Sequence, residues 1–332
     1  MPRTSQLINI RDWTIPISEN LIPVGASDAI TAHLKSAFQR RMPLPGELEP
    51  TLASALDYLL DHPGSLVRPR IVYRLAQVYH FDQESAADLA IALEYFHTAS
   101  LVFDDLPCMD NASMRRGAPC LHVAHGEPVA ILSALALINR AYALAWRAIS
   151  PCPRPYHERA QNYLEQHLGV HGLLNGQSLD LNYSQLPHTL DSTERVAKGK
   201  TVSLISLTLV LPAIAGGASA RELQLLNRIS NCWGLGYQIV DDLKDVLESS
   251  VSIGKTATRD SYLDRPNTAL AIGVSAAVER LLRLLVAGDR SLESLLRLRP
   301  SLAFLRDFRG TLKDELNRVI ESAGAIPIDK KR

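Results

Sequence analysis

The sequence predicts an all-α protein that folds as one domain. Apolar residues recur at intervals of three and four along most of the 332-residue chain, as in helices with one buried face. Alternating apolar and polar residues, the pattern of a half-buried strand, are nearly absent. Two aspartate clusters, within residues 104–110 and 241–245, lie on separate apolar segments and are expected to share one site. A helical bundle that encloses this site is therefore predicted.

Composition narrows the class of protein. The chain is 46% hydrophobic and 21% charged with no formal net charge, so neither nucleic acid nor an anionic membrane surface is indicated as a partner. Its four cysteines are widely spaced and form no CxxC pair, which argues against a disulfide framework or a zinc site. Charges and prolines interrupt the N-terminal segment where a secretory signal would need an apolar run. We expect a cytoplasmic protein.

The single domain is expected to span residues 26–325. Before it, residues 1–25 contain three prolines and are predicted to form an irregular arm, and residues 326–332 are predicted to form a flexible tail. The proline-rich segment 151–155 is interpreted as a loop between helices rather than a domain boundary. The expected helices cover residues 26–41, 47–62, from about 68, 85–106, 127–149, 156–179, 192–217 and 221–248, with two or three more before the tail.

The helix over 85–106 is apolar almost all round, which places it at the centre of the bundle. Pro107 follows it, removes one backbone donor and should disturb the helix end. If the next two residues bulge outward there, Asp110 can return to the side of Asp104 although six residues separate them. The first aspartate cluster would then present its carboxylates together.

The longest apolar stretch, residues 201–220, approaches the length of a membrane span. It contains Pro212 and several Ser and Thr residues, and Lys198 and Lys200 adjoin it. No second span is apparent. We expect a buried core helix and no stable membrane span.

Charge patterning points to a metal site. Asp104, Asp105 and Asp110 are followed closely by Arg115 and Arg116. Carboxylates this crowded repel one another unless a cation lies among them, and Mg²⁺ with an anionic phosphate ligand would satisfy both sets of charges. This pattern predicts a diphosphate site.

The second cluster comprises Asp241, Asp242 and Asp245. Asp241 and Asp245 are four residues apart and therefore share one face of a regular helix. Either cluster alone could be a solvated helix end, but two of them beside long apolar segments favour a clamp that holds a diphosphate through several Mg²⁺.

Two GKT triplets, at 199–201 and 254–256, are similar to the end of a nucleotide-binding P-loop. Neither has the upstream glycine at the required offset, because Glu194 and Ser249 occupy those positions. Nucleotide binding is therefore excluded.

These motifs carry a family resemblance. HTASLVFDDLPCMDNASMRRGAPCLH, GQSLDL, the first GKT and GYQIVDDLKD resemble the trans-isoprenyl diphosphate synthase (polyprenyl synthetase) family in order and spacing, over residues 22–285. The match is most similar to short-chain members that make geranylgeranyl diphosphate. The resemblance implies an isoprenoid synthase-type bundle around a deep central cavity. It also implies a homodimer and about three Mg²⁺ per active site, bound by the six aspartates.

The resemblance further implies roles for single residues. Arg115 would hold an allylic prenyl diphosphate, whereas Arg68, Arg116 and His97 would face a second substrate, isopentenyl diphosphate. Gln177 would line the cavity. Four residues would stabilise the negative charge that develops on the departing diphosphate, through positive charge or hydrogen-bond donors: Lys200, Thr201, Gln238 and Lys255.

Product length would follow from the size of side chains along the prenyl tunnel. In the family, the residue five before the first aspartate forms the tunnel floor, and here it is Ala99, whose methyl group leaves the tunnel open past fifteen carbons. Phe103 would press on the reacting carbons, where an aromatic face can stabilise a carbocation.

One departure from the family decides the expected activity. The family has Gly-Lys-Arg-x-Arg-Pro before the central helix, and its Lys and Arg hold isopentenyl diphosphate, but Ser65 and Leu66 stand at those positions here. Loss of two cationic partners should weaken elongation strongly. The sequence therefore predicts a terpene synthase, in which Mg²⁺-dependent ionisation of farnesyl or geranylgeranyl diphosphate releases diphosphate and gives a linear or cyclic terpene.

Two alternatives stay open. The first is a geranylgeranyl diphosphate synthase, a chain-elongating prenyltransferase whose second site is rebuilt from Arg68, Arg70, His97 and Arg116. The second is a non-catalytic regulatory subunit of a prenyl synthase, against which the two complete aspartate motifs argue.

Overall fold

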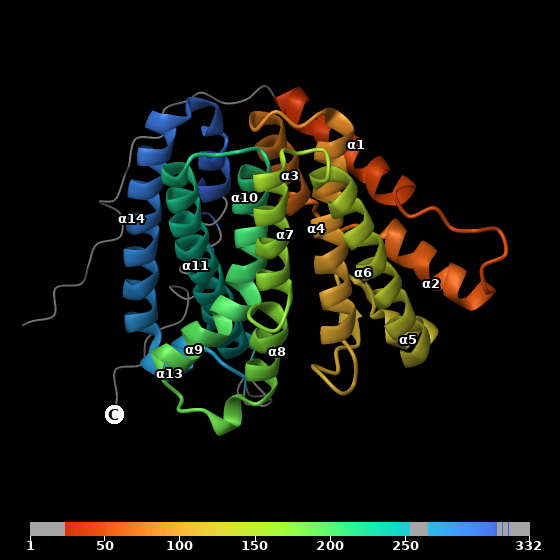
Figure 1. The fold of residues 1–332 in the computed structure, drawn as a ribbon. Coiled ribbons are helices and arrows are strands. Elements are labelled where there is room, and N and C mark those ends of the chain that lie inside the picture. Colours follow the sequence, from red (N-terminus) through yellow and green to blue (C-terminus); the bar gives the residue numbers. More distant parts are fainter. Residues whose placement is uncertain (1–23, 253–264, 311–313, 315–317, 319–332) are drawn as a thin grey trace, which may run out of the picture.

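A computed structural model describes residues 24–252 and 265–310, together with residues 314 and 318. These residues form one bundle of helices with a short two-stranded hairpin, as predicted for an all-α fold (Figure 1). The long elements are α1 (Val24–Arg40), α2 (Pro50–Asp61), α3 (Val67–Val78), α4 (Gln83–Asp104), α6 (Glu127–Ile149), α7 (Arg154–Leu168), α10 (Ser203–Ala215), α11 (Ala220–Ser252) and α14 (Val274–Leu298). The short elements are β1 (Met114–Arg115), β2 (Ala118–Pro119), α5 (Leu121–His125), α8 (Leu173–Leu181), η2 (Tyr183–Gln185), α9 (Leu190–Ala197), η3 (Lys198–Val202), α13 (Thr268–Ile272) and η4 (Pro300–Leu302).

Helix α4 is the central element, as its apolar pattern predicts. Asp82 caps its first turn by accepting hydrogen bonds from two backbone amides, and fifteen of its residues are buried. It packs chiefly against α3 and α6. Alanines are frequent on its buried faces, so neighbouring helices approach closely and leave only its C-terminal end to face the cavity described below.

A buried ion-pair network fixes the N-terminal half of α4. Asp88 is 4% exposed, and its carboxylate accepts hydrogen bonds from Arg41, just after α1, and from Arg147 of α6. A buried carboxylate is stable only when it is paired, so this contact ties three helices to one register.

Two predicted helices are interrupted. The helix expected over 156–179 is divided into α7 and α8, because the chain leaves the helical conformation between Leu168 and Leu173. The helix expected over 192–217 is continuous but includes the π-helical segment η3, which widens the turn between α9 and α10. Both irregularities lie beside the cavity.

The hairpin β1–β2, which follows the first acidic motif, has no signal in the sequence pattern. Met114 pairs with Pro119 and Arg115 with Ala118, and the turn residues Arg116 and Gly117 both have positive φ, 54° and 80°. Two successive residues with positive φ form the tight turn that suits a hairpin twist. Residues 1–23, which include almost all of the predicted arm, and the predicted tail lie outside the described residues.

Three stretches of helix among the described residues are long and apolar enough to span a membrane: Gln83–Asp104, Glu127–Ile149 and Leu190–Ala215. The expectation that only one such stretch exists is therefore wrong. In the most apolar window of α6, only 39% of residues are buried, against 83% in α4. Helix α6 thus carries an exposed apolar stripe, which includes Ile131, Leu132, Leu135, Tyr142 and Trp146.

Candidate active site

A cavity of about 730 Å³ lies among α3, α4, α6, α8, α9, η3 and α11. Its polar lining includes aspartates from both acidic motifs, which confirms that the two distant motifs share one cavity. Its apolar lining includes Phe96, Phe103, Ile138, Tyr142, Leu168 and Leu173. A cavity with carboxylates at one part and hydrocarbon at another suits an amphipathic ligand with an anionic head.

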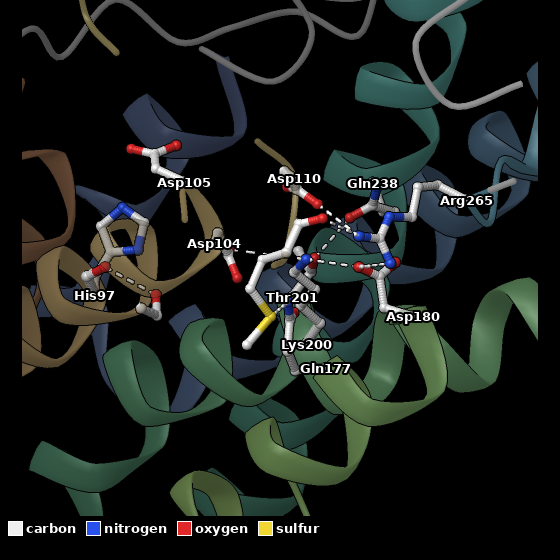
Figure 2. Close-up of polar contacts among 12 residues, drawn as sticks. His97, Asp104, Asp105, Asp110, Gln177, Asp180, Lys200, Thr201, Gln238 and Arg265 are labelled. Atoms are coloured by element: carbon white, nitrogen blue, oxygen red, sulfur yellow. Dashed lines mark hydrogen bonds and ion pairs between the residues drawn. The ribbon is translucent and has the colours of Figure 1, made fainter. Parts of the chain in front are cut away.

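The first acidic motif lies where α4 ends. Helix α4 stops at Asp104, and the chain then folds back so that the amide of Asp110 donates to the carbonyl of Asp104 at 2.9 Å. The return of Asp110 to the side of Asp104 is thereby confirmed. Both line the cavity, whereas Asp105 does not; it is buried and points away from Asp104 (Figure 2).

Asp105 has a structural partner instead. Arg115 donates to its carboxylate, with Nε 3.0 Å from Oδ1. Arg115 also lines the cavity, so the residue that binds Asp105 is part of the site as well. The prediction that Asp105 binds metal is not supported by this geometry.

The second acidic motif lies on α11 across the cavity. Asp241 and Asp242 line it, while Asp245, one turn further, is not among the lining residues. Asp242 is 2% exposed and is held by the side chain of Gln238 at 2.9 Å and by the amide of Thr268 at 2.7 Å. These contacts orient the carboxylate.

In two carboxylates of the cavity, the effect of burial on the pKa exceeds that of the neighbouring cation and hydrogen bonds. It raises the pKa of Asp104 to about 6 although Lys200 opposes the shift, and it raises the pKa of Asp242 to about 6 despite hydrogen bonds from Gln238 and Thr268. Desolvation disfavours a charged carboxylate, and a nearby cation would reverse the effect.

The donor set fits a hard divalent ion. Within residues 24–252 and 265–310, no three His, Cys, Asp or Glu side chains lie together as a metal cluster. Mg²⁺ typically takes only one or two carboxylates and completes its shell with water and phosphate oxygens. Asp104 and Asp110 on one wall, and Asp241 and Asp242 on the other, provide such incomplete sets.

Lys200 provides a cation beside the first acidic motif. Its Nζ lies 2.9 Å from Oδ2 of Asp180 on α8 and 3.8 Å from Oδ2 of Asp104 (Figure 2). Burial disfavours the ammonium, yet the two carboxylates raise its pKa above the ordinary value. Lys200 therefore stays charged inside the cavity.

A close backbone contact sets the position of Lys200. Gly176 of α8 packs tightly against Gly199 and Lys200 of η3. A Cβ on Gly176 would lie 2.4 Å from the backbone nitrogen of Lys200. Only glycine permits this approach. The first GKT is therefore not a P-loop; it lies in a π-helical turn that packs against α8.

The resemblance assigns Thr201 and Gln238 to the same site, and their side chains are hydrogen-bonded to each other. The hydroxyl of Thr201 donates to Oε1 of Gln238 at 2.6 Å, and Gln238 donates in turn to Asp242. On α8, which packs against η3, Gln177 donates to the sulfur of Met109 at 3.9 Å. All of these side chains line the cavity.

Arg265 is a site residue that the sequence analysis missed. Its Nη2 donates to Oδ1 of Asp110 at 2.9 Å and to the carbonyl of Met109 at 3.1 Å, and its Nη1 lies 3.8 Å from Asp180. The only local signal was a cation before Pro266 and a helix start, which no motif distinguishes. Lys255, the other predicted cation, lies outside the described residues.

The predicted second-substrate region differs from expectation at Leu66. This residue is 3% exposed and packs in the hydrophobic core, so it is not part of the cavity wall. Ser65 is exposed and does not line the cavity. Arg68 and His97 do line it, whereas Arg116 lies beside Gly64.

Ala99, the predicted tunnel floor, is fully buried and is not among the residues that line the cavity, whereas its neighbours Phe96 and Ser100 are. Its role as the floor stays a prediction. The ring of Phe96 meets that of Tyr142 edge to face, with centroids 4.8 Å apart. Phe103, next to Asp104, lines the cavity as expected.

Comparison with known proteins identifies the family of this chain. The sequence model of the family described as Polyprenyl synthetase matches residues 49–292. Geranylgeranyl pyrophosphate synthase 7, chloroplastic, from Arabidopsis thaliana is 36% identical over 246 residues, which cover 73% of this chain and 69% of the relative. Geranylgeranyl pyrophosphate synthase 3, chloroplastic, from the same plant is 33% identical over 263 residues, 78% of this chain and 71% of the relative. A geranyltransferase from Helicobacter pylori, solved in complex with magnesium and isoprenyl diphosphate, matches with a TM-score of 0.73 and 25% identity, covering 91% of this chain and 99% of that chain.

Proposed function

Because this chain belongs to the polyprenyl synthetase family, we propose that it is a chain-elongating prenyltransferase of the geranylgeranyl diphosphate synthase type. The observation that carries the proposal is that Arg68 and His97 line the same cavity as both acidic motifs. A terpene synthase needs one diphosphate site, whereas an elongating enzyme needs a second anion site beside the first. Arg68 and His97 supply groups for that second site.

The terpene synthase predicted from Ser65 and Leu66 is not supported by the relatives, which are named geranylgeranyl pyrophosphate synthases. Its physical basis is also weaker than the sequence suggested. Although Ser65 and Leu66 replace two cations of the family, Arg68 and His97, which the resemblance assigns to the second substrate, line the cavity. The prenyltransferase alternative fits better.

In the proposed reaction, the C1–O bond of an allylic prenyl diphosphate breaks and the diphosphate leaves with the electron pair. The double bond of isopentenyl diphosphate then attacks C1, and a carbon–carbon bond forms. The carbon next to the resulting cationic centre loses a proton, which forms a new double bond. The product is an allylic diphosphate one isoprene unit longer.

The residues of the chain support bond cleavage through charge. Lys200 and Arg265 place two cations beside Asp180 and the first acidic motif, where negative charge develops on the leaving diphosphate. The pair Thr201 and Gln238 adds polar groups that are already oriented. Because these groups are held in place before reaction, little reorganisation is needed when the anion forms.

Mg²⁺ is the cofactor we propose, with Asp104, Asp110, Asp241 and Asp242 as the residues that would hold it and about three ions per site. When bound, the metal would neutralise diphosphate oxygens and favour their departure. The buried carboxylates with raised pKa support this choice.

A homodimer is also part of the proposal. Helix α6 exposes Ile131, Leu132, Leu135 and Trp146, a stripe without charged side chains that a second copy could cover. Light scattering coupled to size exclusion would measure the mass, and a monomer would contradict this part of the proposal alone.

The decisive test of function incubates the purified chain with Mg²⁺ and geranyl, farnesyl or geranylgeranyl diphosphate, each with and without isopentenyl diphosphate. We expect longer diphosphates only when isopentenyl diphosphate is present, released as alcohols by phosphatase. Terpenes that form without phosphatase, and without any effect of isopentenyl diphosphate, would overturn the proposal in favour of a terpene synthase.

A variant pair tests whether the chain is an enzyme at all. Asp104→Asn should abolish product formation, whereas Asp191→Asn, which changes an exposed carboxylate on α9, should leave it intact. If Asp104→Asn still supports prenyl synthesis by a co-purified partner at the full rate, the chain acts as a regulatory subunit.

A further inference from the structure

Glu94 on α4 is a buried carboxyl that the reaction above does not use. It is 2% exposed, and its Oε2 has no hydrogen-bond partner among the described residues. It lies three residues before His97, so both side chains project from the same face of the helix. Burial of a carboxyl oxygen without a hydrogen-bond partner costs free energy, so the residues around Glu94 should explain why it is buried there.

Two guanidinium groups from other elements act on Glu94. Arg68 in the first turn of α3 and Arg116 in the β1–β2 turn both favour its ionised form against the effect of burial. In return, Glu94 favours the charged form of Arg116, which burial and Arg68 oppose. One carboxyl thus faces two like charges that repel each other.

The backbone around Arg116 is shaped to bring it here. Arg116 has a φ of 54°, a conformation that a non-glycine residue adopts at a cost. Its guanidinium lies against Gly64, where a Cβ would come within 2.3 Å of Nη1. The turn and the missing side chain together bring Arg116 next to the start of α3, close to Arg68.

His97 completes the cluster on the cavity side. It is 8% exposed, lines the cavity with Arg68, and its Nδ1 has no hydrogen-bond partner among the described residues. Burial and the neighbouring guanidinium groups lower the pKa of His97 well below its ordinary value. A neutral, unsatisfied imidazole beside arginines marks a place where an anion with hydrogen-bonding oxygens would fit.

We propose that Glu94 is a positioning residue: its charge keeps the guanidinium groups of Arg68 and Arg116 beside His97, where they receive the diphosphate of the second substrate. Without it, repulsion between the two guanidinium groups would favour movement of the exposed Arg116 into water. The inference rests on the proposed function and explains how the second site retains affinity although Ser65 replaces the lysine of the family.

The kinetic test compares Glu94→Gln and Glu94→Asp with the unchanged chain at about pH 8. Glu94→Gln should raise the KM for isopentenyl diphosphate about tenfold, with kcat and the KM for the allylic substrate changed less than about twofold. Glu94→Asp, which keeps the charge, should restore most of the affinity. Equal rises in both KM values, or no rise for isopentenyl diphosphate, would overturn the inference.

A matched control is Glu222→Gln, which alters another buried carboxyl, on α11, that is paired with Arg299 and does not line the cavity. It should leave both KM values unchanged. Thermal unfolding of each variant is measured alongside, so that a general loss of folding is separated from a loss of affinity.

Direct binding separates this inference from the proposed function. Titration calorimetry with isopentenyl diphosphate in excess EDTA removes any metal-dependent binding, and the comparison of Glu94→Gln with the unchanged chain reports on the arginine cluster. An affinity about tenfold weaker in Glu94→Gln supports the inference even if the unchanged chain elongates no substrate, a result that would refute the function only. Equal affinities, or no binding by the unchanged chain, would refute the inference even if elongation is observed.

Discussion

Arg265 donates a hydrogen bond to Asp110 at 2.9 Å although 155 residues separate them in the sequence. The same guanidinium reaches the carbonyl of Met109 and lies 3.8 Å from Asp180. It therefore joins the segment before α13 to the first acidic motif and to α8. Arg265 therefore balances part of the negative charge of the cavity (Figure 2). For the diphosphate of the proposed substrate, it would be a cation that is already in place.

Replacement of Arg265 should destabilise the protein when no metal is present. Arg265→Gln leaves two partly buried carboxylates without this counterion, and we expect the free energy of unfolding in EDTA to fall by about 1–3 kcal/mol. Urea denaturation measures it. Arg290→Gln, on the exposed side of α14, serves as the control and should change stability by no more than about 0.5 kcal/mol. Equal losses in both variants would contradict the role assigned to Arg265.

Gly176→Ala should damage both stability and catalysis. The added Cβ would lie 2.4 Å from the backbone nitrogen of Lys200, so α8 and η3 must separate, at a cost of about 1–3 kcal/mol. Lys200 would move with η3, and kcat should fall. Gly46→Ala is a suitable control, since its Cβ would meet no atom within 4 Å. If the two variants unfold at the same temperature and turn over equally, the close approach has no functional consequence.

Product length should respond to Phe96. It lies eight residues before Asp104 on α4, about 12 Å along the helix axis, and its ring contacts that of Tyr142 on the neighbouring helix α6. Phe96→Ala should extend the cavity and shift the products to longer diphosphates, which chromatography of the dephosphorylated alcohols would show. Tyr142→Phe keeps the ring and should leave the distribution unchanged. An unaltered product length in Phe96→Ala would show that the limit lies elsewhere.

Stability should depend on pH through Glu94. Burial raises its pKa to about 7 in the folded protein, against the opposing influence of Arg68 and Arg116, from an ordinary value of 4.5. The folded state therefore keeps a proton that the unfolded state releases between these values, and as the pH rises through this window the folded state loses on the order of 3 kcal/mol. Above pH 7 the loss is complete.

Glu94→Gln removes this dependence. Urea denaturation at several pH values between 5 and 8 should show the unchanged chain losing stability relative to the variant as the pH rises. Parallel profiles would mean that Glu94 does not titrate in this range. A variant that is more stable but binds isopentenyl diphosphate more weakly would identify Glu94 as a residue kept at a cost in stability for binding.

The helices and the two acidic motifs could be predicted because helical periodicity and charge spacing are local properties of a chain. The return of Asp110 to Asp104 was predictable for the same reason, since Pro107 ends the helical pattern within the motif itself. The family followed from these motifs in order. No contact between distant residues was needed for any of these conclusions.

The orientation of side chains around α4 depended on tertiary packing. On α4, Ala99 is buried while Phe96 lines the cavity, and at the start of α3 Leu66 packs in the core while Arg68 lines the cavity. The apolar surface of α4 is nearly uniform, so its sequence does not indicate which residues face the cavity, and packing against α3 and α6 decides it. The expected tunnel floor and the expected loss of the second site were both assigned from sequence position alone.

The sequence by itself determined the fold class, the acidic motifs and the family, since each is written in patterns that span a few turns of helix. The tertiary structure alone decided which aspartates face the cavity, that Arg265 reaches Asp110, and that Glu94 is buried where Arg68 and Arg116 favour its charged form. These outcomes depend on contacts between elements far apart in the chain, whose geometry is set by packing of the whole bundle and not by any local pattern.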